Sequence, residues 1–126
     1  MKNLNLIKHE LNQYYGCIQP FHGMNKNSIY TDGIKHLLEE AECYWLYDII
    51  QFEIYDLLRR KNVLDVFYFT ISVKKDSDVA ELFLRDYKKD VIWAKKIDYT
   101  DFPYGELEFV VGWDGERLTT CLHSEN

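Results

Sequence analysis

The sequence predicts an α+β domain in which N-terminal helices pack on an antiparallel sheet. Three observations predict it. Apolar residues recur at helical spacing in the first half of the chain, they alternate along short segments of the second half, and the connections there are too short for parallel crossovers. We expect helices over about 3–15 and 31–60 and a four- to five-stranded meander over about 65–122, all within a single domain, residues 1–126.

The first helix is indicated by apolar residues one turn apart. Leu4, Ile7 and Leu11 would share one face of it. Gly16 is a suitable residue to end this helix. The following stretch, 17–29, is rich in turn-forming residues and is expected to be a loop.

The second helix is expected to begin at Thr31 or Asp32, because either side chain can accept from the free amides of the first turn. It is apolar on two faces and should therefore be buried on two sides. A break near 42–43 would give two shorter helices, and Asn62 can end the second. The two apolar faces consist of Ile34, Leu37, Leu38, Ala41, Trp45, Ile49 and Phe52, and of Leu46, Ile50, Ile54 and Leu57.

After residue 62 the apolar period changes from helical to alternating, which is typical of strands with one buried face. Asp114 and Gly115 form a strong signal for a tight hairpin. The expected strands cover 67–73, 80–85, 91–97, 107–113 and 117–122.

The composition limits the classes of partner. A net charge of -6 disfavours direct contact with a nucleic acid backbone and allows a basic protein partner. Aromatic residues make up 16% of the chain, which is more than one small core needs. We therefore expect some tyrosines on a surface that contacts another protein.

Cofactors, metals and membranes are not expected. The three cysteines form no CxxC pair, and we expect a reducing, cytoplasmic setting. The start of the chain has no run of signal-peptide character, and no stretch approaches the roughly 20 apolar residues of a membrane span. His9, His36 and His123 show no metal-ligand spacing, and there is no glycine-rich phosphate loop.

Three residues could serve acid–base chemistry, although no catalytic residue is assigned. His22 lies in the predicted loop, and a histidine side chain can act as an acid or a base near neutral pH. Asp32 could orient it or could simply cap the helix. Asp48 lies among apolar residues and, if buried, needs a partner.

A second group of candidates suits binding. Tyr99, Asp101, Phe102 and Tyr104 combine aromatic and acidic side chains in the turn before a strand. Exposed aromatics beside acids are more typical of a binding rim than of a catalytic cleft.

Three stretches resemble the signatures of an uncharacterised family of small bacterial proteins, often met in phages and mobile elements. The stretches are 30–37 (YTDGIKHL), 44–50 (YWLYDII) and 99–103 (YTDFP). The resemblance covers nearly the whole chain and implies a single-domain protein without known catalytic residues. It also adds Tyr30 to the binding candidates, together with His22 and Asp32, which lie in or near the first stretch. Small acidic proteins of such elements often inhibit host defence by binding.

Three hypotheses follow. The first is a protein-binding module, in the manner of an anti-CRISPR protein, that contacts a host or phage protein through its aromatic and acidic surface. The second is a small enzyme that uses His22 with Asp32 or Asp48. The third is a structural homodimer joined through an edge strand.

Overall fold

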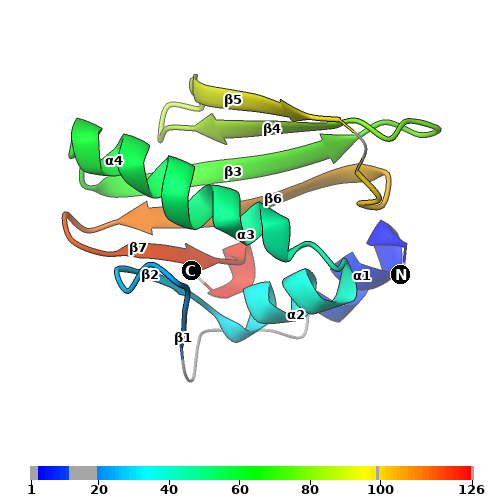
Figure 1. The fold of residues 1–126 in the computed structure, drawn as a ribbon, viewed down its shortest axis with the longest axis horizontal. Helices are drawn as coiled ribbons and strands as arrows, with labels where there is room; N and C mark the ends of the chain where they lie inside the picture. The colour runs from blue at the N-terminus through cyan, green and yellow to red at the C-terminus, as the bar shows by residue number, and fades with distance from the viewer. Residues whose placement is uncertain (1–2, 12–19, 99, 126) are drawn as a thin grey trace.

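Helices pack along a twisted sheet in the computed structural model, which describes residues 3–11, 20–98 and 100–125 (Figure 1). The α+β class predicted from the sequence is confirmed. The helices are α1 (Leu4–Leu11), α2 (Asp32–Glu40), α3 (Tyr44–Ile49), the π-helix η1 (Ile50–Ile54), α4 (Tyr55–Lys61) and the 3-10 turn η2 (His123–Glu125). The strands are β1 (Phe21–His22), β2 (Ser28–Tyr30), β3 (Asp65–Val73), β4 (Ala80–Arg85), β5 (Val91–Ile97), β6 (Gly105–Trp113) and β7 (Leu118–Cys121). Within the described segments, no helix has both the length and the apolar character of a transmembrane span.

The second predicted helix is broken, as the alternative reading allowed. Thr31 is its N-cap, and the Thr31 side chain accepts from the amide of Ile34 at 3.5 Å. The chain leaves the helix after α2, where Glu42 has a left-handed φ of 51°. Asn62 ends α4 in the same region, with φ 49° and its amide bonded to the Leu58 carbonyl. Left-handed residues reverse the chain direction and so stop a helix.

The π-helix between α3 and α4 changes which side chains face the core. A π turn is wider than an α turn and shifts the residues after it around the helix axis. Ile50 and Ile54 are buried as expected, whereas Phe52, expected on an apolar face, is 48% exposed. The same segment buries the polar side chain of Gln51.

The sheet has seven strands in the order β1-β2-β7-β6-β3-β4-β5, so its strand order differs from the expected meander and its strand count is higher. After β5 the chain returns to pair β6 with β3 along nine residues, which gives the order of a Greek key. The pairing joins the two long apolar strands at the centre, where Phe69 and Phe109 stack with ring centroids 5.2 Å apart. β5 carries Lys95 and Lys96 and lies at the edge, a usual position for charged strands.

The two additional strands, β1 and β2, lie in the stretch expected to be a loop. They are too short to show an alternating pattern. β2 is parallel to β7, and hydrogen bonds from the Leu118 amide to the Asn27 carbonyl (2.8 Å) and from the Thr31 amide to the Thr120 carbonyl (3.2 Å) hold its two ends. This pairing attaches the β1–β2 hairpin to β7, the last strand along the chain.

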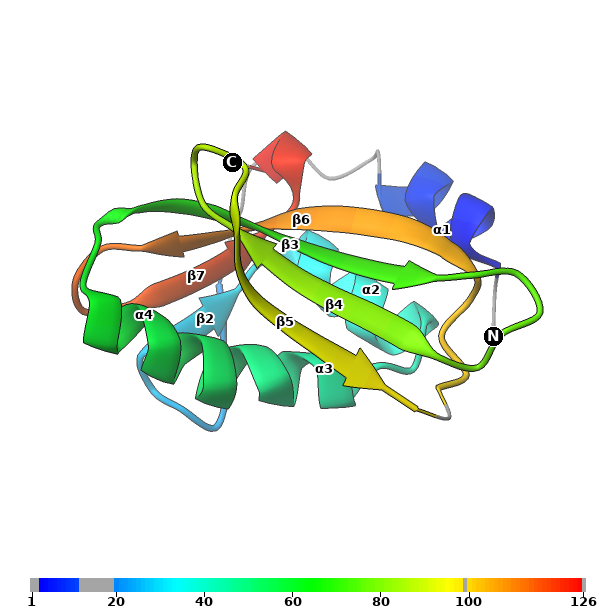
Figure 2. The same ribbon diagram turned by 90° about the horizontal axis from the view of Figure 1, so that it is seen from above.

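The apolar core lies between the helices and the sheet. Figure 2 shows α3 and α4 running along one side of the sheet. Alternate residues of the central strands, Phe67, Phe69 and Ile71, are buried against this side. α1 contributes Leu4 and Ile7 to the same cluster.

The last residues of the described chain cap α2. Glu125 accepts from the Thr31 hydroxyl (2.5 Å), from the Gly33 amide (3.1 Å) and from the Leu122 amide (3.1 Å). A carboxylate in this position is stabilised by the free amides of the helix N-terminus. A Cβ at Gly33 would lie 2.4 Å from the Leu122 side chain and 2.6 Å from Glu125 Oε1, so a larger residue would force these two side chains to shift.

Candidate functional site

A hollow of about 360 Å³ opens where the β1–β2 hairpin faces α3 and the start of η1. Its lining combines aromatic, acidic and amide side chains, and the sequence reasoning had singled out only some of them. The lining residues are His22, Gly23, Met24, Tyr30, Tyr44, Tyr47, Asp48 and Gln51.

The buried amide of Gln51 holds the hairpin against the helix. Its Oε1 accepts from the Asn25 amide (3.1 Å), and its backbone carbonyl accepts from Asn25 Nδ2 (3.0 Å). A Cβ at Gly23 would lie 2.2 Å from Gln51 Oε1 and 2.8 Å from Tyr47, so glycine is needed for this contact. The hollow is therefore a built feature, held by three hydrogen-bonding and packing constraints on one loop.

Tyrosine rings form its wall. The Tyr30 and Tyr47 rings lie 4.6 Å apart at 59°, and Phe21 stacks on Tyr30 at 5.6 Å. The Tyr47 hydroxyl is 2.5 Å from Ser28 Oγ, and burial raises the pKa of Tyr47, so this phenol is neutral. Tyr44 is 48% exposed, and it lies on neither of the two apolar faces expected for this helix. The break before α3 turns the Tyr44 side chain toward solvent.

Two of the three acid–base candidates line this hollow. His22 and Asp48 both face it and are both exposed, and Asp48 Oδ1 accepts from Gln51 Nε2 at 2.9 Å. Asp32 is the first residue of α2 and is not among the described lining residues. The structure therefore associates His22 with Asp48 and Tyr30, and separates Asp32 from them.

The turn that carries the other binding candidates is a separate region. Asp101 and Tyr104 are exposed, but Phe102 is only 4% exposed, so its expected place on an exposed rim is wrong. Phe102 packs in the apolar core cluster. Its burial depends on contacts with distant residues, which the local sequence does not show. Tyr99 lies outside the described residues. None of the three described turn residues lines the hollow; Asp101 instead lies near Cys43, whose pKa it helps to raise after the larger effect of burial.

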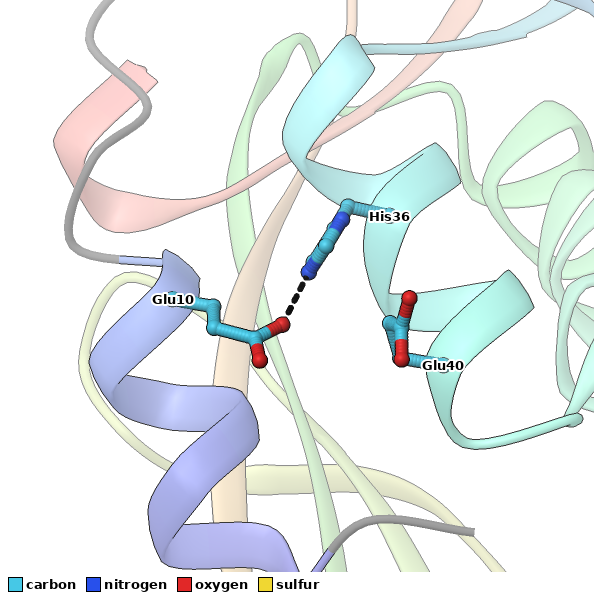
Figure 3. Close-up of side chains that lie close together, drawn as sticks. All are labelled: Glu10, His36 and Glu40. Atoms are coloured by element: carbon cyan, nitrogen blue, oxygen red, sulfur yellow. Dashed lines mark hydrogen bonds and ion pairs between the residues drawn. The ribbon is translucent and has the colours of Figure 1, made fainter.

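A third group of polar side chains meets between α1 and α2. Figure 3 shows Glu10 reaching from α1 toward His36 and Glu40 on α2. His36 Nε2 lies 2.6 Å from Glu10 Oε2, and one ligand atom from each of the three residues lies within 4.8 Å of the others. All three are half-buried. No metal-ligand spacing is visible in the sequence, because Glu10 and His36 are 26 positions apart, although His36 and Glu40 do share one helix face.

No curated protein and no solved structure matches this chain. A family model does match, over residues 5–126, and its description is a family of unknown function, DUF6876. The three sequence stretches also resembled an uncharacterised family. The match agrees with that expectation in one respect: the family has no assigned activity. The chain belongs to the family of unknown function DUF6876.

Proposed function

We propose that this chain is a protein-binding module that receives a cationic side chain of a partner protein in the hollow of Tyr30, Tyr44 and Asp48. The observation that carries the proposal is the convergence of the exposed Tyr44 ring, the half-buried Tyr30 ring and the Asp48 carboxylate around one cavity. A volume of about 360 Å³ suits a single long side chain.

The electrostatics of the hollow favour an arginine or a lysine. Tyrosine faces attract cations, and Asp48 adds a carboxylate at the same place. A neighbouring ring already holds a cation within the chain, because Lys35 Nζ lies 5.2 Å from the centroid of Phe21. The net charge of -6 would also steer a basic partner toward the molecule.

The proposed partner class is a host or phage protein with a basic surface, such as a nuclease of a host defence system. Nucleases of this kind bind nucleic acid through arginine and lysine, so an acidic module that takes up these side chains would compete with the nucleic acid. The proposed setting is the cytoplasm, a reducing compartment in which the buried Cys43 thiol would stay reduced. The proposed link to phages, mobile elements and CRISPR effectors comes from the family resemblance. Identification of a binding partner would test this link directly.

The experiment has two stages. In the first, the full chain is titrated with N-acetyl-arginine amide and, as a matched control, with N-acetyl-norleucine amide, while amide chemical shifts are recorded by NMR. Only the arginine compound should shift the amides around Tyr44, Asp48 and Gln51. Equal shifts with both compounds, or shifts elsewhere, would overturn the proposed occupant.

In the second stage, the tagged chain captures partners from bacterial lysate, and the captured protein is purified and its affinity measured. Tyr44→Ala and Asp48→Asn should each weaken binding at least tenfold. Tyr87→Ala is the matched control, since Tyr87 is 57% exposed and does not line the hollow. Undiminished binding by both hollow variants would count against the proposal, as would the absence of any partner.

A second candidate function is a small enzyme, favoured by the presence of His22 and Asp48 on the same hollow. His22→Gln would then abolish turnover in a screen of hydrolase substrates while leaving the arginine-dependent shifts in place. If His22→Gln loses the arginine-dependent shifts and the wild type shows no turnover, His22 contributes to binding and the enzyme hypothesis is contradicted. The homodimer hypothesis stays a prediction: β5 lies at one edge of the sheet, and light scattering of the isolated chain would test whether two copies pair there.

A further inference from the structure

We infer that Glu10, His36 and Glu40 form a binding site for a divalent transition-metal ion, with Zn²⁺ as the ion best suited to the donors. The site is distinct from the hollow, because none of the three residues lines that cavity. Its ligands come from two helices and meet in the space between them (Figure 3).

The spacing of the ligands favours a single ion. His36 and Glu40 are one helical turn apart on α2, so their side chains point to the same side. Atoms bound about 2.1 Å from one ion lie at most about 4.2 Å apart. The three ligand atoms already lie within 4.8 Å of one another, so modest side-chain movements would complete the site.

The charges of the cluster also favour a cation. Two carboxylates and one imidazole present their electron pairs at the same place, where one cation would contact all three side chains. The 2.6 Å contact between His36 Nε2 and Glu10 Oε2 already brings two of the three ligand atoms together.

The donor types select the class of metal. One imidazole nitrogen and two carboxylate oxygens suit zinc and its first-row neighbours, whereas magnesium and calcium prefer oxygen alone. The side chains of His36 and Glu10 are 22% and 21% exposed, so solvent reaches the site. With three protein ligands, a fourth position stays open for water or for a donor from a bound molecule.

The experiment uses the full chain after treatment with a chelator and measures binding of ZnCl₂ alone by calorimetry. We expect one ion per chain. Glu40→Gln and His36→Gln should each lower the affinity at least tenfold, since even outer-shell changes have effects of this size. Two separate variants, each checked by circular dichroism, keep a folding defect in one of them from deciding the result.

Glu108→Gln is the matched control. Glu108 pairs with His123 at 2.9 Å, in a His–Glu contact that no third ligand joins within the described residues. This variant should bind zinc as the wild type does. Absence of zinc binding by the wild type, or equal affinities of the wild type and Glu40→Gln, would overturn the inference.

Two further measurements separate this site from adventitious binding. Co²⁺ in place of zinc should show the d–d bands of a nitrogen and oxygen site, and an intense thiolate charge-transfer band would contradict the assignment by placing the ion on a cysteine. Hydrogen exchange should show that zinc slows exchange in α1, because the ion would join α1 to α2. Unchanged exchange in α1 would also count against the inference.

Discussion

The α2 helix and the α3–η1 segment arise from one periodic stretch of sequence, yet they present different chemistry. α2 faces α1 with His36 and Glu40, whereas α3 faces the β1–β2 hairpin with Tyr44 and Asp48. The break around Cys43 separates the two directions. One amphipathic pattern, interrupted once, therefore presents two unlike clusters: an imidazole with carboxylates on α2, and aromatic and acidic side chains on α3.

The largest expected effect concerns Cys43, at the joint between the two halves. Burial, with a smaller effect of the Asp101 carboxylate, raises the pKa of the Cys43 thiol from an ordinary value of about 9 to about 12. The unfolded chain therefore loses this proton above about pH 9, while the folded chain keeps it until about pH 12. The free energy of unfolding should fall by about 1.4 kcal/mol per pH unit across this window, and the contribution is fully present below pH 9.

Urea unfolding at several pH values between 8 and 11 would measure this slope. Cys43→Ala removes the thiol and should give a flatter pH dependence, whatever its effect on stability at pH 8. Equal slopes for the two proteins would show that the thiol at the joint does not remain protonated in the folded state.

The next effect tests the hollow. Gly23→Ala places a methyl group within 2.2 Å of Gln51 Oε1 and should push the hairpin away from α3. We expect a loss of about 1–3 kcal/mol in the free energy of unfolding, measured by chemical denaturation. Gly112→Ala is the matched control, because a Cβ there meets nothing closer than 4.0 Å and should change stability by less than about 0.5 kcal/mol. Similar losses in both variants would mean that the hairpin is not held in the way described.

The smallest effect tests the cluster on α2. In metal-free protein, Glu40→Gln should change the free energy of unfolding by less than about 0.5 kcal/mol, because Glu40 is half-buried and its charge lies beside a second carboxylate. Thermal unfolding in the presence of a chelator would measure this. A large loss would identify Glu40 as a structural residue of the helix pair and would remove the contrast with the hollow.

The parts of the fold that depend on local patterns could be predicted from the sequence. Alternation located β3 to β7, and the caps at Thr31 and Asn62 were visible as residue types. The strand order was not visible, since pairing of β6 with β3 depends on which long apolar strands meet at the centre. The π turn and the short strands β1 and β2 have no periodic signal, because their geometry is imposed by distant contacts such as those of Gln51.

The candidate sites were predictable to a smaller extent. His22 and Asp48 were chosen for their chemistry and Tyr30 for the family resemblance, and the structure brings the three to one hollow. Met24 and Tyr44 were missed, because their exposure depends on the helix break and on the loop that Gln51 holds. The contact between Glu10 and His36 could not be read from spacing, since it exists only when α1 packs on α2.

The parallel pairing of β2 with β7 has a consequence for synthesis on the ribosome. β2 forms its longest-range contacts with a strand from the other end of the chain, and the α2 cap uses Glu125, which is made later still. Contacts so distant in sequence are formed slowly and cannot form before the later partner has been translated. A nascent chain can therefore form the β3–β4–β5 hairpins before β7 has been translated and can pair with β2. The attachment of the β1–β2 hairpin to the sheet, which needs β7, is therefore among the last features of the molecule to form.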